Sequence, residues 1–296
     1  VKPIRAIMIT HGLWKPKIIR RSGTHRAWRL RRAAYGEMIQ FDGCYHPWFE
    51  DRAGVSCLLL AVDDATSTVP RGAFDLHEGV RPVFAFWQAY VTQIGVPVSI
   101  YLDKFSTYKM NSAVAQDNHD LKTQFQRAMT SLGVEVIFAH SPQAKGRVEN
   151  KFKTLQDRLV KELRLIGASD QEQGNRFLQQ QFIPAFNKQF GVPPRTPHNL
   201  HRPLTLKERE NLSSIFSIQV ERVVQNDWTI SYRKQWYQLA AKQTTTVQKR
   251  DTVMVEDWLD QTIHFRLRGK YLNAKPIPKR PNASSSIPWV LAGTPA

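Results

Sequence analysis

Residues 57–63 restrict the possible folds of this chain more than any other stretch. The run Cys-Leu-Leu-Leu-Ala-Val-Asp is apolar at almost every position. A strand that alternates apolar and polar residues can leave one face in water, whereas a continuously apolar strand must be covered on both faces. The run therefore predicts a sheet with a layer of structure on each side.

The patterns around this run predict a mixed α/β domain. In four further short stretches, apolar residues alternate with polar ones or run together, and we expect these stretches to be strands. In three other stretches, apolar residues recur at three- and four-residue spacing, and we expect these to be helices. The strands are expected at 38–42, 68–76, 96–103 and 134–139, and the helices at 79–94, 120–132 and 145–165. The order β-β-β-α-β-α-β-α indicates a five-stranded mixed sheet with flanking helices.

The chain after this domain changes character. We expect a helical extension with a Pro-rich linker, and then several short β-prone runs that predict a small all-β barrel. The expected division is 1–34 as a basic arm, 35–165 as the α/β core, 166–205 as the extension and linker, 206–274 as the barrel and 275–296 as a flexible tail.

The charge of the chain favours a polyanionic partner. The sequence holds 42 Lys and Arg against 25 Asp and Glu, a formal net charge of +17. Ten of these basic residues lie in the arm, which has no Asp or Glu, and Trp14 and Trp28 lie among them. Nucleic acid is the expected partner, with phosphate contacts from Arg20, Arg21, Arg29, Arg31 and Arg32. The alternative is that the arm is a solvated tail.

Other compositional features exclude several classes of protein. Cys44 and Cys57 are the only cysteines, so neither a disulfide framework nor a cysteine-rich zinc site is supported. No apolar run is long enough for a membrane span, and there is no signal-peptide pattern. We expect a cytoplasmic protein. Because the sequence begins with Val1, we expect a processed chain or a fragment.

Three carboxylates are candidates for a metal site. Asp42 and Asp103 come at the expected ends of two strands, where ligands gather in open α/β sheets, and Glu149 comes early in the expected helix 145–165. Three carboxylates in one place repel each other unless cations lie between them, and hard oxygen ligands suit Mg²⁺ or Mn²⁺. Two such ions can promote in-line phosphoryl transfer.

Each of these acids also has a purely structural interpretation. Glu149 could form an ion pair with Lys153, four residues further along the helix. Asp42 could end its strand in a turn with Gly43, and Asp103 could do the same for its own strand.

Further polar and aromatic residues have structural interpretations that we favour. Asp63 and Asp64 are expected to hydrogen bond within a turn, and His140 is expected to be a loop residue. Phe177, Phe182, Phe186 and Phe190 are expected to make core or oligomer contacts. Core packing is favoured over DNA stacking for the four β-domain aromatics, Trp228, Tyr232, Trp236 and Tyr237.

Four motifs carry a family resemblance. They are Gln-Phe-Asp-Gly at 40–43, Leu-Leu-Leu-Ala-Val-Asp-Asp-Ala-Thr-Ser at 58–67, Tyr-Leu-Asp-Lys at 101–104 and His-Ser-Pro-Gln-Ala-Lys-Gly-Arg-Val-Glu at 140–149. Together they resemble the catalytic core of DDE transposases, in particular insertion-sequence transposases of the ISNCY type, which are related to retroviral integrases. The resemblance covers about residues 35–205, and the β region resembles the small C-terminal domain of these transposases.

The resemblance implies an RNase H-like core and an SH3-like barrel. It implies catalysis by Asp42, Asp103 and Glu149 with two Mg²⁺ or Mn²⁺ ions, Asp42 bridging both, Asp103 holding one and Glu149 the other. The reaction would cut double-stranded DNA at element ends and join the 3′-hydroxyl ends to target DNA, in a homo-oligomer on DNA. DNA contacts are expected from Lys145, Arg147, Lys151, Lys153 and Gln156. The alternatives are a catalytically silent DNA-binding protein and an RNase H-like nuclease.

Overall fold

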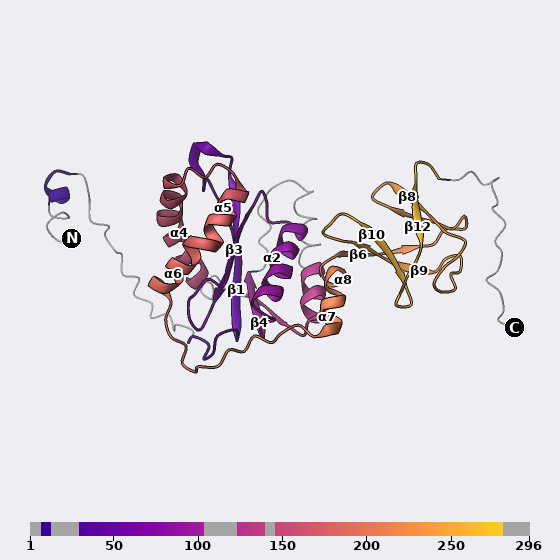
Figure 1. Cartoon of the computed structure of the whole chain (residues 1–296), viewed down its shortest axis with the longest axis horizontal. Coiled ribbons are helices and arrows are strands. Elements are labelled where there is room, and N and C mark those ends of the chain that lie inside the picture. Colours follow the sequence, from indigo (N-terminus) through magenta and orange to yellow (C-terminus); the bar gives the residue numbers. More distant parts are fainter. Residues whose placement is uncertain (1–6, 13–29, 104–122, 140–145, 281–296) are drawn as a thin grey trace. The chain divides into compact units, whose positions relative to one another are not determined.

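The computed structural model describes residues 7–12, 30–103, 123–139 and 146–280. The side chains of residues 103, 139, 146 and 147 are outside this description. The chain divides into two compact units, Val1–Leu30 and Arg31–Ala296. In the first unit, residues 7–10 form a short helix. All further elements belong to the second unit, which is shown in Figure 1.

A five-stranded mixed sheet forms the centre of the domain that follows the arm, as the sequence predicts. Its strands are β1 (Met38–His46), β2 (Ser56–Asp63), β3 (Arg71–Asp75), β4 (Ser99–Asp103) and β5 (Glu135–Ala139), in the order β3-β2-β1-β4-β5. The pairs β1–β2 and β2–β3 are antiparallel, and the pairs β1–β4 and β4–β5 are parallel. A short 3-10 helix, η1 (Glu50–Arg52), lies between β1 and β2.

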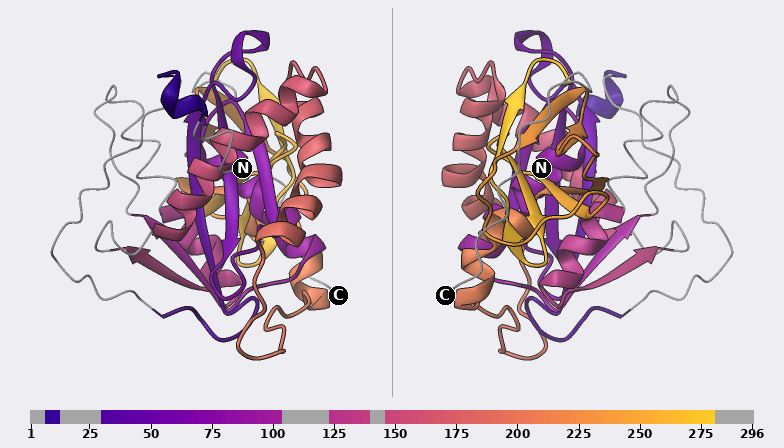
Figure 2. Two further views of the ribbon diagram at one scale, coloured as in Figure 1. Left: turned by 90° about the vertical axis from the view of Figure 1, so that its left-hand side faces the viewer. Right: turned by 90° about the vertical axis from the view of Figure 1, so that its right-hand side faces the viewer.

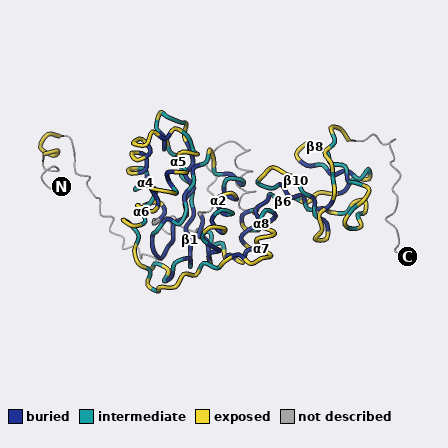
Figure 3. The backbone as a smooth tube through the Cα atoms, in the orientation of Figure 1, coloured by how far each residue is buried: buried dark blue, intermediate teal, exposed yellow. Residues whose placement is uncertain are grey.

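Helices cover both faces of this sheet, which satisfies the requirement set by β2. All eight residues of β2 are buried. Cys57, Leu59 and Ala61 pack in one core cluster with α2 (Val80–Gln93) and with the helix at 123–131. Leu58, Leu60 and Val62 pack in a second cluster on the other face. Figure 3 shows the strands dark blue between the partly exposed helices, and Figure 2 shows the layers from two sides.

The second cluster is formed with the helices that follow β5. They are α4 (Gly146–Leu165), α5 (Gln171–Phe177), the π-helical turn η3 (Leu178–Phe182) and α6 (Ile183–Phe190). The apolar stripe expected on α4 is buried along its whole length, through Val148, Phe152, Leu155, Leu159 and Leu163. None of the described helices is long and apolar enough to cross a membrane.

Strand β1 extends further than the sequence suggested. We expected it to end at Asp42, but it continues through Gly43 to His46. The reason is that Gly43 to His46 pair with Ser56 to Leu59 in the antiparallel ladder, so β2 holds the strand beyond the Asp-Gly pair. Asp42 is therefore inside β1 and not in a terminating turn.

The linker after α6 is attached to the rest of the domain by short bridges. Tyr35 pairs with Asn199, and Val96 pairs with Arg202. The linker leads into α7 (Leu206–Glu210) and α8 (Leu212–Ile215). Thr205 and Glu208 form a capping box at the start of α7. Phe216 is fully buried in the first core cluster, so the segment after α8 still belongs to the packing of the α/β domain.

The C-terminal region is all-β, but the expected SH3-like barrel is not confirmed. One sheet has the order β11-β10-β9-β6 and the other β12-β8-β7. The strands are β6 (Ile218–Val223), β7 (Thr229–Tyr232), β8 (Gln235–Leu239), β9 (Thr252–Asp257), β10 (Ile263–Leu267), β11 (Lys270–Tyr271) and β12 (Ala274–Ile277). The two sheets are open and share one apolar cluster. Strand β12 lies largely in the stretch that we expected to be tail, because its pairing with β8 orders it.

His201 gives the folded chain a specific pH dependence. Its Nε2 is 2.9 Å from the Tyr90 hydroxyl, and its Nδ1 is 2.8 Å from Asn199 Oδ1. Burial lowers the pKa of the imidazole from the usual 6.5 to about 4. The unfolded chain therefore binds the proton first, so the free energy of unfolding should fall as the pH drops from about 6.5 towards 4. Urea denaturation of His201→Gln should show a smaller fall over this range, while a variant of the exposed His198, His198→Gln, should keep the full fall. Equal pH dependence in all three proteins would contradict this role.

Candidate active site

Asp42 lies on the face of β1 that is covered by α4. Side chains alternate along a strand, so Gln40, Asp42 and Cys44 share one face. Gln40 Oε1 accepts a hydrogen bond of 3.3 Å from the backbone N–H of Val148, and Cys44 Sγ accepts one of 3.4 Å from Gln156 Nε2. Both partners belong to α4, so this face of β1 is turned towards that helix.

The two contacts also fix the direction of α4. The four residue-to-residue steps from Gln40 to Cys44 span about 13 Å of strand, and the eight steps from Val148 to Gln156 span about 12 Å of helix. The helix thus runs alongside β1 in the same direction. Asp42 lies midway between the two contact points and is half-buried.

Glu149 is in the first turn of α4, on the side that is turned to β1. It precedes Gln156 by seven residues, which is two helical turns, so the two residues share one side of the helix. Gln156 reaches β1, whereas the buried stripe with Val148 packs against Leu58 and Leu60 of β2. Glu149 is exposed, and its carboxylate is favoured by the helix dipole. The i,i+4 ion pairs between described side chains join Asp157 to Lys161 and Glu172 to Arg176, and do not include Glu149 with Lys153.

Asp42 and Asp103 lie the same number of residues beyond the end of the ladder that joins their strands. The parallel ladder pairs Met38 with Ser99 and ends with the pair of Gln40 and Tyr101. Each aspartate follows two residues after that last pair, on adjacent strands of the sheet. Asp103 is the last residue of β4, as expected from the sequence. Its side chain lies outside the described part of the chain.

The donor atoms available at this place fit a hard divalent cation. Three carboxylates supply oxygen ligands, which Mg²⁺ and Mn²⁺ prefer, and Asp42 and Glu149 lie on facing sides of β1 and α4. Among the side chains that the structure describes, no group of three or more His, Cys, Asp or Glu residues is close enough to hold a metal ion. Asp103, the third candidate, is not among those side chains.

Sequence reasoning missed Glu78, which lies behind Gly43. A Cβ atom at Gly43 would come within 2.5 Å of Glu78 Oε2 and 3.1 Å of Cys57 Sγ. The backbone N–H of Glu78 donates to the Tyr45 hydroxyl. Glycine in this strand marks a close approach, and that was the one available signal. Glu78 comes from the loop before α2 and adds a carboxylate on the opposite face of β1.

Cys44 is a neutral thiol beside the candidate acids. Burial is the main cause that raises its pKa, and the negative charges of Asp42 and Glu78 raise it further, while the hydrogen bond from Gln156 acts in the other direction. Cys44 and Cys57 are both free, as the sequence predicts.

The basic residues expected at the site lie in different surroundings. Lys153 is exposed on the side of α4 that carries Glu149. Lys151 is on another side, with its Nζ 4.9 Å from the ring centre of Phe186 and 5.8 Å from that of Phe190. Burial lowers the pKa of Lys151. Gln156 is engaged by Cys44. Lys145 lies outside the described residues, as does the side chain of Arg147.

The arm's two described arginines, Arg31 and Arg32, contact the turn after β2. Arg31 Nη1 donates to Ser67 Oγ at 2.7 Å, and the backbone N–H of Arg32 donates to Asp64 Oδ2 at 2.8 Å. Asp63 accepts hydrogen bonds from the backbone N–H groups of Gly36 and Thr66. Asp63 thus hydrogen bonds within the turn, as expected, whereas Asp64 accepts hydrogen bonds from Arg32 and Gln40 outside the turn. Arg20, Arg21, Arg29 and His140 lie outside the described residues.

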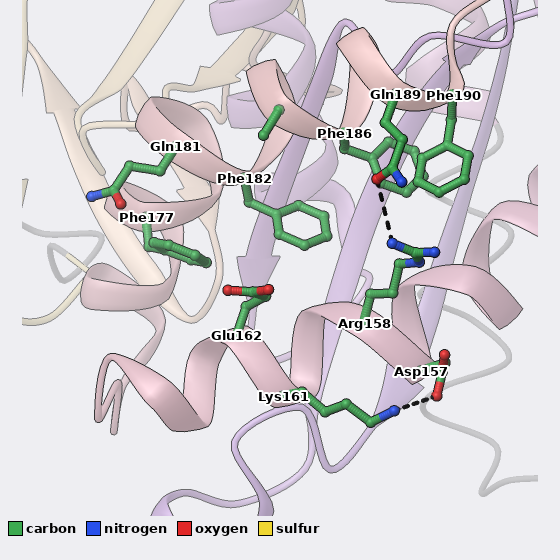
Figure 4. Close-up of a pocket in the computed structure, with 11 residues that line it drawn as sticks. Asp157, Arg158, Lys161, Glu162, Phe177, Gln181, Phe182, Phe186, Gln189 and Phe190 are labelled. Atoms are coloured by element: carbon green, nitrogen blue, oxygen red, sulfur yellow. Dashed lines mark hydrogen bonds and ion pairs between the residues drawn. The ribbon is translucent and has the colours of Figure 1, made fainter. Parts of the chain in front are cut away.

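A pocket of about 490 Å³ lies on a different side of α4 from the three acids. It is lined by α4 residues, including Asp157, Arg158 and Glu162, and by the aromatic side of α5 to α6 (Figure 4). Phe177, Phe182 and Phe186 are buried in the second core cluster, and Phe190 packs against it. The core interpretation of these rings is confirmed, and the pocket does not contain the candidate site.

The aromatic residues of the C-terminal region are divided between core and surface. Tyr232 is buried and donates its hydroxyl to Asp257, and Tyr237 packs on Phe265 with ring centres 5.0 Å apart. Trp228 and Trp236 are half-buried, and each carries a cation over its ring, from Lys249 and Arg280 respectively.

Two curated relatives match this chain in sequence. It is 36% identical over 269 residues to the "Putative transposase y4bF" of Sinorhizobium fredii, an alignment that covers 91% of this chain and 58% of the relative. It is 32% identical over 212 residues to the "Transposase for insertion sequence IS1202" of Streptococcus pneumoniae, covering 71% of this chain and 44% of the relative. The chain thus spans about half the length of these relatives. It is a homologue of these two transposases, which confirms the resemblance to transposases. No protein-family model matches it.

Two solved structures are similar to a limited degree. One is a simian T-cell lymphotropic virus intasome in complex with a PP2A regulatory subunit, with 15% identity, coverage of 93% of this chain and 95% of that chain, and a TM-score of 0.43. The other is the dimeric HTLV-2 integrase catalytic core in complex with magnesium, with 16% identity, coverage of 50% of this chain and 88% of that chain, and a TM-score of 0.37. Both TM-scores are below 0.5, so neither similarity establishes a shared fold.

Proposed function

We propose that this chain is the catalytic part of a transposase with an RNase H-like core. It would cut DNA at the ends of a mobile element and join the 3′-hydroxyl ends to target DNA, with Asp42, Asp103 and Glu149 as ligands for two Mg²⁺ or Mn²⁺ ions. Double-stranded DNA would be its substrate, and joining two ends to one target would require a homo-oligomer.

The observation that carries this proposal is that Asp42 and Glu149 lie on facing sides of β1 and α4. Asp42 lies between two contacts that attach β1 to α4, Glu149 lies next to the first of these contacts on the side of α4 turned to β1, and Asp103 ends the strand beside β1. Sequence similarity to two transposases supports the same reaction class. Acids so far apart in the chain come to neighbouring elements because β4 pairs with β1 and α4 runs along β1.

The chain's own residues have distinct tasks in this proposal. When bound, the two ions would neutralise charge at the scissile phosphate and polarise the attacking and leaving oxygens. The three carboxylates hold the ions and carry no bond to DNA themselves. Lys153, exposed beside Glu149, is placed to contact a phosphate near the scissile bond. The neutral thiol of Cys44 adds no further negative charge at the site.

Conservative replacement of the acids should abolish catalysis while DNA binding persists. For Asp103→Asn and Glu149→Gln, we expect Mg²⁺-dependent cleavage of a labelled duplex with the element's end sequence to fall at least about 100-fold, because even residues that only orient metal ligands change activity about 10- to 100-fold. The dissociation constant for the duplex, measured in EDTA, should change less than about threefold, since few phosphate contacts are lost.

The matched control for this experiment is Glu162→Gln. Glu162 is also an exposed glutamate of α4, but it lines the pocket on another side of the helix. Its replacement should leave cleavage unchanged. Binding without any metal-dependent product in the unmodified chain would favour a catalytically silent DNA-binding protein. Cleavage without strand joining would favour an RNase H-like nuclease.

Lys151 and Lys153 should differ in their effect on DNA binding, although the sequence gives both the same role. Lys153→Gln should reduce the slope of log K against log salt by about 0.9, the value for one lost phosphate contact. Lys151→Gln should leave the slope unchanged, because its ammonium is held over Phe186. Fluorescence anisotropy at several salt concentrations measures both slopes. A loss with Lys151→Gln equal to that with Lys153→Gln would show that Lys151 leaves the ring to bind DNA.

Removal of the arm should also reduce the salt dependence of DNA binding. The deletion should stop before Leu30, since Arg31 and Arg32 are attached to the turn after β2. Residues 1–29 hold eight Lys and Arg. Their deletion should reduce the slope of log K against log salt by about 0.9 for each phosphate contact that is lost. Arg31→Gln in the full chain is the control and should leave the slope unchanged. If the deletion also leaves it unchanged, the arm is a passive tail.

A further inference from the structure

Gln40 is a buried amide whose two ends are both in use. The residue lies in β1, two positions before Asp42, and is 1% exposed. Its Oε1 accepts the hydrogen bond from the Val148 backbone N–H, and its Nε2 donates to Asp64 Oδ1 at 2.7 Å. Asp64 is fully buried and uses its other oxygen, Oδ2, to accept from the backbone N–H of Arg32.

The Val148 N–H requires a partner from outside its own helix. Val148 is the third residue of α4, and the first N–H groups of a helix have no acceptor within it. Its side chain is fully buried, and Gln40 supplies the acceptor for its backbone N–H. The start of α4 is thus attached to β1 at the residue directly before Glu149.

The orientation of the Gln40 amide follows from its partners. The Val148 backbone N–H can only donate, so it requires the amide oxygen of Gln40, and the amide NH₂ group then donates to Asp64 Oδ1. A reversed amide would place its NH₂ group against an N–H and its oxygen against a carboxylate. Asp64 therefore holds the carbonyl end of Gln40 towards α4, and the backbone of Arg32 holds Asp64.

We propose that Gln40 is a positioning residue for Glu149, and that Asp64 orients Gln40 for this task. This inference rests on the proposed function, in which Glu149 is a metal ligand. Glu149 is exposed at the start of a helix, where the backbone frays most easily. A fixed Val148 amide holds that first turn against the strand that carries Asp42, so the two carboxylates keep their spacing before any ion binds.

The test compares Gln40→Met with the matched control Ile39→Val. Methionine has a similar length to glutamine but lacks its amide donor and acceptor. Ile39 is the buried neighbour of Gln40 on the opposite face of β1, and it packs in the first core cluster, which contains no described residue of α4. EPR measures the binding of Mn²⁺ to each variant. We expect Gln40→Met to bind Mn²⁺ about 10- to 100-fold more weakly, which is the effect of replacing residues that orient metal ligands. Ile39→Val should bind Mn²⁺ within about threefold of the unmodified chain, since it leaves that contact intact.

Hydrogen exchange gives a second measurement that does not depend on the metal. In metal-free protein, the amides at the start of α4 should exchange at least about tenfold faster in Gln40→Met, while those near Leu159 and Leu163 keep their protection. Ile39→Val should not produce this local difference. Gln40→Asn is the second variant, in case Gln40→Met does not fold. Its amide is too short to span both partners, and it should show the same changes.

The outcomes separate this inference from the proposed function. If the unmodified chain binds Mn²⁺ and either Gln40 variant binds it equally, with unchanged exchange at α4, the positioning role is overturned. If Glu149→Gln binds Mn²⁺ as well as the unmodified chain does, the metal role of Glu149 fails, whatever the exchange data show for Gln40. Faster exchange together with weaker Mn²⁺ binding in the Gln40 variants, but not in Ile39→Val, supports both.

Discussion

The burial of β2 on both faces is the constraint on which the rest of the α/β domain depends. One set of its side chains requires α2 and the helix at 123–131, and the alternate set requires α4, α5 and α6. The apolar stripe of α4 can be buried only along β2 and β1, so the helix must run beside these strands. That same requirement brings the start of α4, with Glu149, beside the strand that carries Asp42. The candidate site is therefore a consequence of core packing, and the acids are placed by apolar residues that take no part in the chemistry.

Sequence patterns predicted most elements of this domain because their signals are local. The continuous apolar run of β2 and the five-membered stripe of α4 each specify one element and its buried side. The end of β1 could not be predicted in this way, since residues Gly43 to His46 are held as a strand by pairing with β2. Strand β12 was missed for the same reason, as Lys275 and Pro276 have no strand signal of their own. Long-range pairing decided both cases.

The candidate site could be predicted only as a set of residue types. Asp42, Asp103 and Glu149 were visible because carboxylates at strand ends and at a helix start are typical of metal sites. The sequence could not show that Lys151 and Lys153 have different roles. Lys151 lies on the side of α4 that faces α6, and Lys153 lies on the side that carries Glu149. Nor could it show that Glu78 approaches Gly43, or that Arg31 and Arg32 are attached to the turn after β2. These features depend on contacts between segments that are distant in the chain.

The α4-facing side of β1 is polar, whereas Ile39 and Phe41 on its other side are apolar, and this contrast connects the fold to the proposed chemistry. Ile39 and Phe41 face the first core cluster, whereas Gln40, Asp42 and Cys44 face α4. Polar groups under a helix destabilise a fold unless they have partners. Gln40 has Val148 and Asp64, and Cys44 has Gln156, so the two outer positions hold the helix. The residue between them is Asp42. A strand that uses its flanking polar residues to attach a helix leaves the central carboxylate in a rigid frame, which is the arrangement that a site for hard cations requires.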